Sequence, residues 1–130
     1  MTKLKNRTKS VQSVELSDGR VAGIGDVVVD TKGFHDAQIV AVFGTTVATG
    51  SIKLFESDAS GGSFTQAVDA DGVDIEIPYG SGDADSILTL AIENLNLNLR
   101  KRFYRLDTVT GTADICGIIQ LGSPDTAPTV

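Results

Sequence analysis

The sequence predicts an all-β fold, an antiparallel β-sandwich of the jelly-roll type with about eight to nine strands. Composition is the first indication, because Val, Ile and Thr supply 36 of the 130 residues whereas Glu and Lys supply only 10. The second is that short apolar or alternating segments recur at roughly 8–12-residue spacing with no strand–helix–strand pattern. The third is the presence of 14 glycines, which suit tight turns.

The first part of the body reads as strands separated by polar turns. Residues 37–43 form an apolar, β-branched run, which we interpret as a buried strand that ends in a turn at Gly44. Residues 45–56 alternate in polarity and predict a half-covered strand. The segment 57–63 is rich in Ser, Asp and Gly and predicts a turn into a short strand at 64–68, which completes a hairpin.

A second turn and strand follow. Residues 69–72 predict the turn, and residues 73–77 alternate apolar with acidic side chains. We expect this strand to end at Pro78, because proline has no N–H to donate to a neighbouring strand. Residues 80–85 are a polar, Gly-containing loop.

The segment 87–99 fits two interpretations. Apolar residues at 84, 87, 88, 91, 92 and 95 would line one side of a helix, whereas residues 88–92 and 95–99 each alternate as a strand would. We favour strands, with a bulge or short loop at 93–96, because the alternation changes parity at Asn94. The helical interpretation stays open at this point.

The last part of the body predicts a hairpin. Residues 100–110 read as a long strand, Gly111 and Thr112 as a turn, and residues 113–121 as the final buried strand. One or two further strands are expected within 11–16 and 20–29.

The chain divides into an extended N-terminal arm at 1–19, a sandwich domain at 20–122 and an extended C-terminal tail at 123–130, which contains two prolines among small polar residues. Residues 1–10 carry four basic side chains and no acidic one, whereas residues 11–130 hold 17 acidic against seven basic residues. The net charge of −6 argues against general binding to nucleic acid or to anionic membranes. A cationic arm on an anionic body suggests that the arm contacts an acidic neighbour, which could be a second copy.

The sequence predicts neither export nor membrane insertion. The basic N-terminus is not followed by the apolar segment of a secretion signal, so we expect the product to stay in the cytoplasm where it is made. All apolar runs are far shorter than the roughly 18–20 residues that a membrane-spanning helix needs.

Chemical groups for catalysis are sparse, so we expect no enzyme activity. The one His, His35, lies beside Asp36, but neighbouring residues on an extended chain point to opposite sides, and a structural or surface role is expected. The one Cys, Cys116, lies in an apolar strand, where we expect it to be buried and inert.

The acidic turns do not predict a metal or cofactor site. Asp69, Asp71 and Asp74 surround a glycine, but no Glu stands at the twelfth loop position of a calcium loop, so we interpret them as a solvated turn. Asp83 and Asp85 lie in a Gly/Ser loop typical of ordinary turns.

A basic and aromatic strip at 100–105 is the strongest charge cluster in the body. Alternation along a strand would put positions 100, 102 and 104 on one side and positions 101, 103 and 105 on the other, so the four cations cannot form a single patch. We expect these guanidinium groups to pair with Asp carboxylates, within or between subunits, rather than with nucleic acid. The candidate interface residues are therefore Lys3, Lys5, Arg7, Lys9, Arg100, Arg102, Tyr104 and Arg105.

Residues 37–122 also carry a resemblance. The order of an apolar strand, SIKLFESDASGGSFTQAV, an acidic spacer, KRFYRLDTVTGT and a final strand ending IIQLGSPDTAPT resembles the small jelly-roll cement, or head-decoration, proteins of tailed bacteriophages. The resemblance implies a late-acting virion protein that binds the outer surface of an icosahedral head as a dimer or trimer. Its partner would be the major capsid protein, whose subunit contacts it would stabilise.

A second function class fits the same fold. A carbohydrate- or receptor-binding sandwich of a phage fibre or tail would also be all-β. Such sites usually expose aromatic rings, and this chain has only five Phe, two Tyr and no Trp. The capsid-binding interpretation is therefore preferred.

Overall fold

The structure is a computed structural model that describes residues 9–92 and 101–124. These residues form one eight-stranded antiparallel sheet and a single 3₁₀ turn, η2 (Ser81–Asp83), and contain no helix long and apolar enough to cross a membrane. The strands are β1 (Lys9–Gly23), β2 (Val29–Asp30), β3 (Phe34–Val47), β4 (Gly50–Ser57), β5 (Thr65–Gln66), β6 (Glu76–Tyr79), β7 (Ile87–Ala91) and β8 (Phe103–Pro124).

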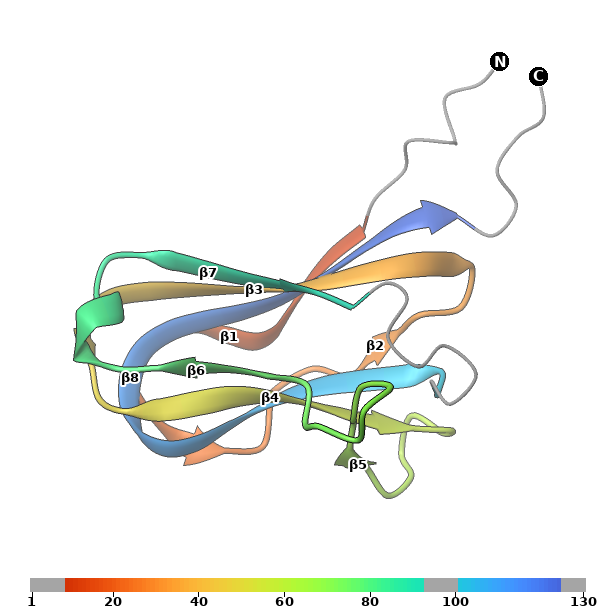
Figure 1. The fold of residues 1–130 in the computed structure, drawn as a ribbon, viewed down its shortest axis with the longest axis horizontal. Coiled ribbons are helices and arrows are strands. Elements are labelled where there is room, and N and C mark those ends of the chain that lie inside the picture. The colour runs from red at the N-terminus through yellow and green to blue at the C-terminus, as the bar shows by residue number, and fades with distance from the viewer. Residues whose placement is uncertain (1–8, 93–100, 125–130) are drawn as a thin grey trace, which may run out of the picture.

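The sheet folds over itself into two layers, and β8 runs through both (Figure 1). The first part of β8 pairs with β4, from Phe103 opposite Ser57 to Val109 opposite Ser51. The second part pairs with β3, as far as Pro124 opposite Phe34. One layer therefore contains most of β1, β3, β7 and the second part of β8, and the other contains the end of β1, β2, β4, β5, β6 and the first part of β8.

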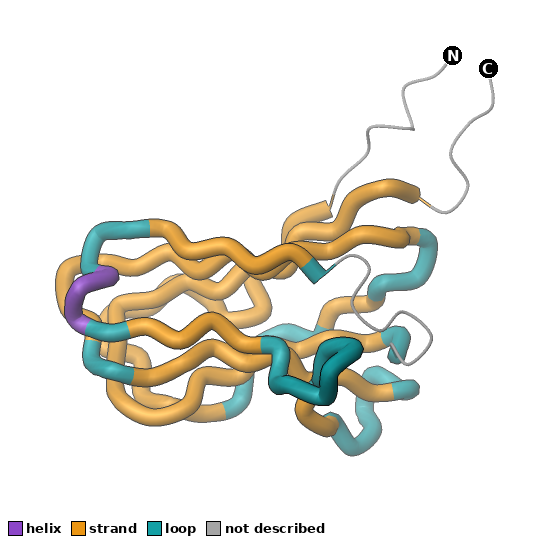
Figure 2. The backbone as a smooth tube through the Cα atoms, in the orientation of Figure 1, coloured by secondary structure: helices purple, strands orange, loops and turns teal. Residues whose placement is uncertain are grey.

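The register shows that the other strands follow the same bend. β3 and β4 lie one after the other along one edge of β8, while β1 and β2 follow its other edge. β7 and β6 in turn lie along the far edge of β3 and β4. All these paths turn at one end of the molecule, which we call the bent end (Figure 2). At the opposite, open end β1 begins beside the last residues of β8.

The hydrophobic core lies between the two layers. The apolar side chains with no exposed surface are Val14, Ile39, Ala41, Ile52, Leu54, Ala67, Leu106 and Ile119. They come from strands of both layers, so burial of apolar surface holds the folded sheet closed.

The all-β antiparallel sandwich is confirmed, with the refinement that its layers share strands instead of forming two separate sheets. The strand interpretation of 87–91 is also confirmed, since β7 pairs with β3 in regular register and directs Leu88 and Leu90 toward the core. The predicted bulge at 93–96 lies outside the described residues.

The predicted hairpin turn at Gly111 and Thr112 is wrong. β8 continues through these residues, and positive φ angles of 59° at Thr110 and 71° at Gly111 bend it instead of reversing it. A left-handed pair of residues gives the same sequence signal in a bend as in a hairpin turn. The predicted turn at Gly44 is wrong for a related reason, because β3 continues to Val47.

Two further boundaries differ from the prediction. Pro78 lies inside β6, opposite Ser51, where an edge strand tolerates a residue without an N–H. The segment expected as a strand at 64–68 forms only the two-residue β5 and one isolated bridge, Val68 to Asp74.

The expected arm and tail also begin elsewhere. Residues 9–19, which the sequence assigns to the extended arm, belong to β1, which contains the strand expected within 11–16, and β8 extends through Pro124. Alternation is hard to see in 9–19 because register shifts interrupt β1 after Gln12, Val14 and Ser17. Residues 1–8 and 125–130 lie outside the described residues.

Asp114 connects three strands at the bent end. Its carboxylate accepts hydrogen bonds from the Gly19 N–H of β1 at 2.7 Å, the Thr46 N–H of β3 at 3.1 Å and the Thr45 hydroxyl at 3.4 Å. The N–H of Gly19, then that of Thr46, lowers the pKa of Asp114 below its usual value. The ionised form of Asp114 therefore stabilises the bend.

Replacing Gly111 tests the bend directly. We expect Gly111→Ala to lower the free energy of unfolding by about 1–3 kcal/mol, because the residue is left-handed there. A Cβ would also approach the Thr49 carbonyl oxygen to 2.5 Å. Urea unfolding measures the loss. Gly61→Ala is the control, since nothing lies within 4 Å of its Cβ position. An equal effect of both substitutions would contradict this account of the bend.

The pH dependence of stability tests Asp114. Because the folded-state pKa is lowered, its stabilisation is complete well above the ordinary value of 3.8 and is lost as the pH falls through the folded-state pKa. We expect Asp114→Asn to lower Tm by several degrees at neutral pH, with the difference from wild type shrinking below pH 3.8. Thermal unfolding between pH 7 and strongly acidic solution measures this. A difference that stays constant with pH would assign the effect to packing.

Candidate functional site

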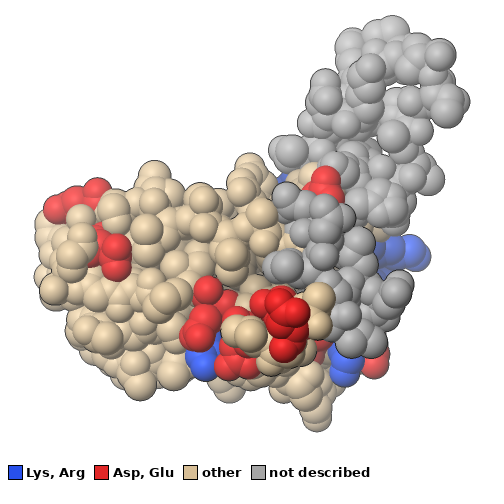
Figure 3. All heavy atoms as spheres, in the orientation of Figure 1, with Lys and Arg blue, Asp and Glu red and all other residues tan. Residues whose placement is uncertain are grey.

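The outer surfaces of the two layers differ in charge. The outer side of β2, β4, β6 and the first part of β8 carries most of the ion pairs, and we call it the charged face. In Figure 3, which shows the layers from the side, acidic side chains gather along the near edge of this layer, and a second group lies at the bent end. Alternation places Lys53, Arg105 and Asp107 outward, because their strand neighbours, such as Leu54 and Leu106, are buried, whereas Arg102 lies just before β8.

Arg105 is the most constrained cation of the charged face. Its Nε and Nη2 donate to the two carboxylate oxygens of Asp107, each at 2.7 Å. The guanidinium carbon lies 4.5 Å from the ring centroid of Phe64 and 5.6 Å from that of Phe55. Asp107 also accepts the N–H of Gly25 at 2.9 Å. Arg105 is thus held within its own chain.

Arg102 forms a second bidentate pair, but a more exposed one. Its Nε and Nη2 donate to Asp30 of β2 at 2.8 and 2.7 Å, and 47% of its side chain remains exposed. The hydrogen bond from Arg102 is the main cause of a strongly lowered Asp30 pKa. The prediction that the strip at 100–105 pairs with Asp carboxylates is confirmed for both arginines.

The carboxylates of the acidic turn at 69–74 form hydrogen bonds and an ion pair with neighbouring groups. Asp69 accepts the backbone N–H groups of Asp71 and Val73 at 2.8 and 3.0 Å, and Asp74 pairs with Lys53 of β4 at 3.3 Å. Among residues 9–92 and 101–124, no group of three His, Cys, Asp or Glu side chains is arranged to hold a metal ion.

The remaining predicted residues are placed as follows. Lys9 is exposed at the start of β1, whereas Tyr104 is only 5% exposed and packs in the core, so it does not contribute to the surface of a single chain. Lys3, Lys5, Arg7 and Arg100 lie outside the described residues, and the side chain of His35 is not among those described. Cys116 is buried as predicted, and burial raises the pKa of its thiol.

The opposite outer surface lacks charge along its centre, and we call it the uncharged face. It is the outer side of β1, β3, β7 and the second part of β8. Its outward residues are Ser10, Gln12, Gln38, Val40, Val42, Ile87, Thr89, Ala91, Ile118 and Gln120, and Cys116 lies on the same side but is covered by its neighbours. Among the outward positions that the structure describes on β3 and β8, carboxylates occur only toward the two ends of the face, at Asp36 and Asp114.

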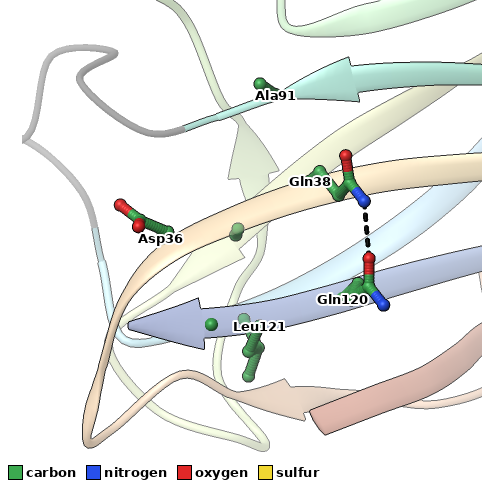
Figure 4. Close-up of a pocket in the computed structure, with 7 residues that line it drawn as sticks. Asp36, Gln38, Ala91, Gln120 and Leu121 are labelled. Atoms are coloured by element: carbon green, nitrogen blue, oxygen red, sulfur yellow. Dashed lines mark hydrogen bonds between the residues drawn. The ribbon is translucent and has the colours of Figure 1, made fainter. Parts of the chain in front are cut away.

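A shallow hollow of about 240 Å³ lies on this face near the open end. Its lining includes Asp36, Gln38, Ala91, Gln120 and Gly122. Figure 4 shows the two glutamines pointing toward one another across β3 and β8, where Gln38 Nε2 donates to Gln120 Oε1 at 2.5 Å. The small side chains at 91 and 122 leave the space open.

Sequence reasoning missed the uncharged face. The signal was present in the outward positions of three segments, 38–42, 87–91 and 116–120, none of which carries a charged residue. It could not be combined without the register that places these segments side by side.

No protein-family model matches the chain, and no curated protein matches it in sequence. Among solved structures, the fold is similar to that of the SPBc2 prophage-derived protein YomS, known from a crystal structure, with a TM-score of 0.51. The match covers 89% of this chain and 93% of that one at 11% sequence identity. The two proteins share a fold. The similarity therefore covers most of both chains.

The two arginine pairs predict different mutant phenotypes. We expect Arg105→Ala to lower the free energy of unfolding by about 2–3 kcal/mol, because it leaves the carboxylate of Asp107 desolvated and removes two ring contacts. Arg102→Ala is the matched control, with a much smaller loss because its pair is half exposed. Urea unfolding of both variants measures this, and equal losses would show that burial does not distinguish the pairs.

Proposed function

We propose that this chain is a non-enzymatic virion protein of a tailed bacteriophage that binds the outer surface of the head and cements contacts between major capsid protein subunits. The observation that supports the proposal most directly is the fold, which resembles that of a prophage-derived protein over 89% of the chain. The segment resemblance to head-decoration proteins at 37–122 points to the same class.

The arrangement of the chain ends suits a clamp. Lys9 at the start of β1 lies opposite Leu121 near the end of β8, so both terminal segments are attached to the open end of the domain. The N-terminal segment carries Lys3, Lys5 and Arg7 and no acidic residue. Attachment at one end lets both segments reach the same neighbouring surface, where cations favour an acidic partner.

The charged face supports the proposal indirectly. Arg102 and Arg105 are already paired within the chain, so the N-terminal cations are better candidates for contacting the capsid than the strip at 100–105. A clamp of this kind gains affinity from several copies per head, since linked weak contacts act together.

The carbohydrate-binding alternative has one feature in its favour, the hollow on the uncharged face. Its lining supplies two amides and one carboxylate, which could bind hydroxyl groups, but no aromatic ring among the lining residues on which a sugar could stack. A glycan array therefore serves as the control experiment.

The proposal is tested by adding purified protein to heads of the same phage that lack it. We expect cryo-electron microscopy to show regular occupancy of lattice positions and the heads to resist higher temperatures. Scattered or absent density together with binding to a glycan would favour the alternative instead.

The N-terminal segment is tested in the same assay. Deletion of 1–8 leaves β1 intact from Lys9, and we expect it to weaken head binding at least tenfold. Joint Lys3→Gln, Lys5→Gln and Arg7→Gln substitution removes the charge at constant length and separates charge from contact area. Lys32→Gln, at an exposed cation of the body, is the control. If the protein lacking residues 1–8 binds heads as tightly as wild type, the N-terminal segment does not contribute to head binding.

A further inference from the structure

The uncharged face is unusual for a chain with this charge. The described residues hold 15 acidic against seven basic side chains, so two copies repel one another over most of their surfaces. The cross-strand rows of Ile87 with Val42 and Cys116, and of Thr89 with Val40 and Ile118, carry no charge. The centre of this face, between Asp36 and Asp114, can therefore meet the same centre of an identical face without placing like charges opposite each other.

Strand pairing places the residues of the uncharged face side by side. The other exposed apolar residues do not form such a regular surface. Leu16, Val21 and Ile24 are 66–72% exposed, but they lie along the irregular part of β1 among Glu15, Asp18 and the Arg20–Asp26 pair. Packing two copies through that segment would bring carboxylates together. The uncharged face carries no such penalty.

The size of the face matches a weak contact. β3 and β8 each contribute about eight residue steps of about 3.4 Å, whereas β7 and the regular part of β1 contribute about four or fewer, so strands about 4.8 Å apart give an area on the order of 400 Å². Two such faces bury on the order of 800 Å² in total, which is the size of a weak, transient interface.

The relief of the face suggests one orientation. Ile87 protrudes with 63% of its surface exposed, and the hollow lies beside Ala91 on the same strand. A twofold axis across the strands at Thr89 would exchange these two positions, so that each Ile87 enters the hollow of the other copy. Identical patches meeting in this way form a closed, isologous dimer.

We propose that the uncharged face is the interface of a homodimer, in which Ile87 of each copy packs into the hollow beside Ala91 of the other. The proposal deepens the proposed function, because a dimer would present two sets of terminal segments to the capsid. It rests on the geometry and charge of one sheet face, and it can be tested with the purified protein in the absence of capsids.

Sedimentation velocity of the full chain from micromolar to near-millimolar concentration tests the dimer. We expect wild type to dimerise, and Ile87→Lys and Thr89→Arg each to weaken association at least tenfold. Both substituted side chains are exposed, so the folded monomer is expected to survive, which circular dichroism and Tm verify. Val73→Lys is the matched control, since Val73 is 58% exposed but lies in the turn before β6.

A cross-link tests the orientation. Packed sheets lie about 10 Å apart, farther than the roughly 7 Å between Cα atoms that a disulfide spans, so a short bismaleimide is the probe. We expect Thr89→Cys to give a covalent dimer and Val73→Cys to give none, while the native Cys116 is buried. Equal yields from the two variants would overturn the proposed orientation.

The proposal fails if wild type is monomeric throughout, if its dimer survives both face substitutions, or if Leu16→Lys dissociates the dimer and Ile87→Lys does not. Head binding separates the two proposals. A chain that occupies the head lattice as a monomer would disprove the dimer and leave the capsid function in place. A chain that dimerises through this face but does not bind heads would support the dimer and disprove the capsid function.

Discussion

The passage of β8 through both layers is the constraint on which the rest of the structure depends. One strand of 22 residues pairs with β4 in one layer and with β3 in the other, so a single continuous strand joins the two layers. The bend at Thr110 and Gly111 brings the two halves face to face. Apolar side chains of both layers are then buried between them, and this burial supplies the main driving force.

The same bend determines where functional surface is available. One layer directs Arg105, Asp107 and Lys53 outward, where ion pairs and ring contacts occupy them. The other directs Val40, Val42 and Ile118 outward, with no charge beside them. A domain with one face occupied by internal ion pairs and one uncharged face has a clear division between a surface that stabilises the fold and a surface suited to association.

The placement of the chain ends adds a second functional element. β1 begins and β8 ends together at the open end, far along the sheet from the bend. The cationic residues of the N-terminal segment are thereby attached at one end of an acidic domain. Association through the uncharged face and contact through the chain ends would use separate parts of the molecule, so neither role would obstruct the other.

The sequence by itself determined the all-β class, the burial of Cys116 and the pairing of Arg102 and Arg105 with carboxylates, and it favoured a strand over a helix at 87–91. These depend on local alternation, apolar runs and charge balance, which are properties of neighbouring residues. Only the tertiary structure decided that Gly111 bends a strand instead of reversing it, that β1 runs on without a break through residues 17–19 and that Tyr104 is buried. It also assembled the uncharged face, because Ile87, Val42 and Cys116 share a row only through pairing between segments that lie up to 74 positions apart. Register between distant strands is decided by the packing of the whole sheet, and no short segment contains it.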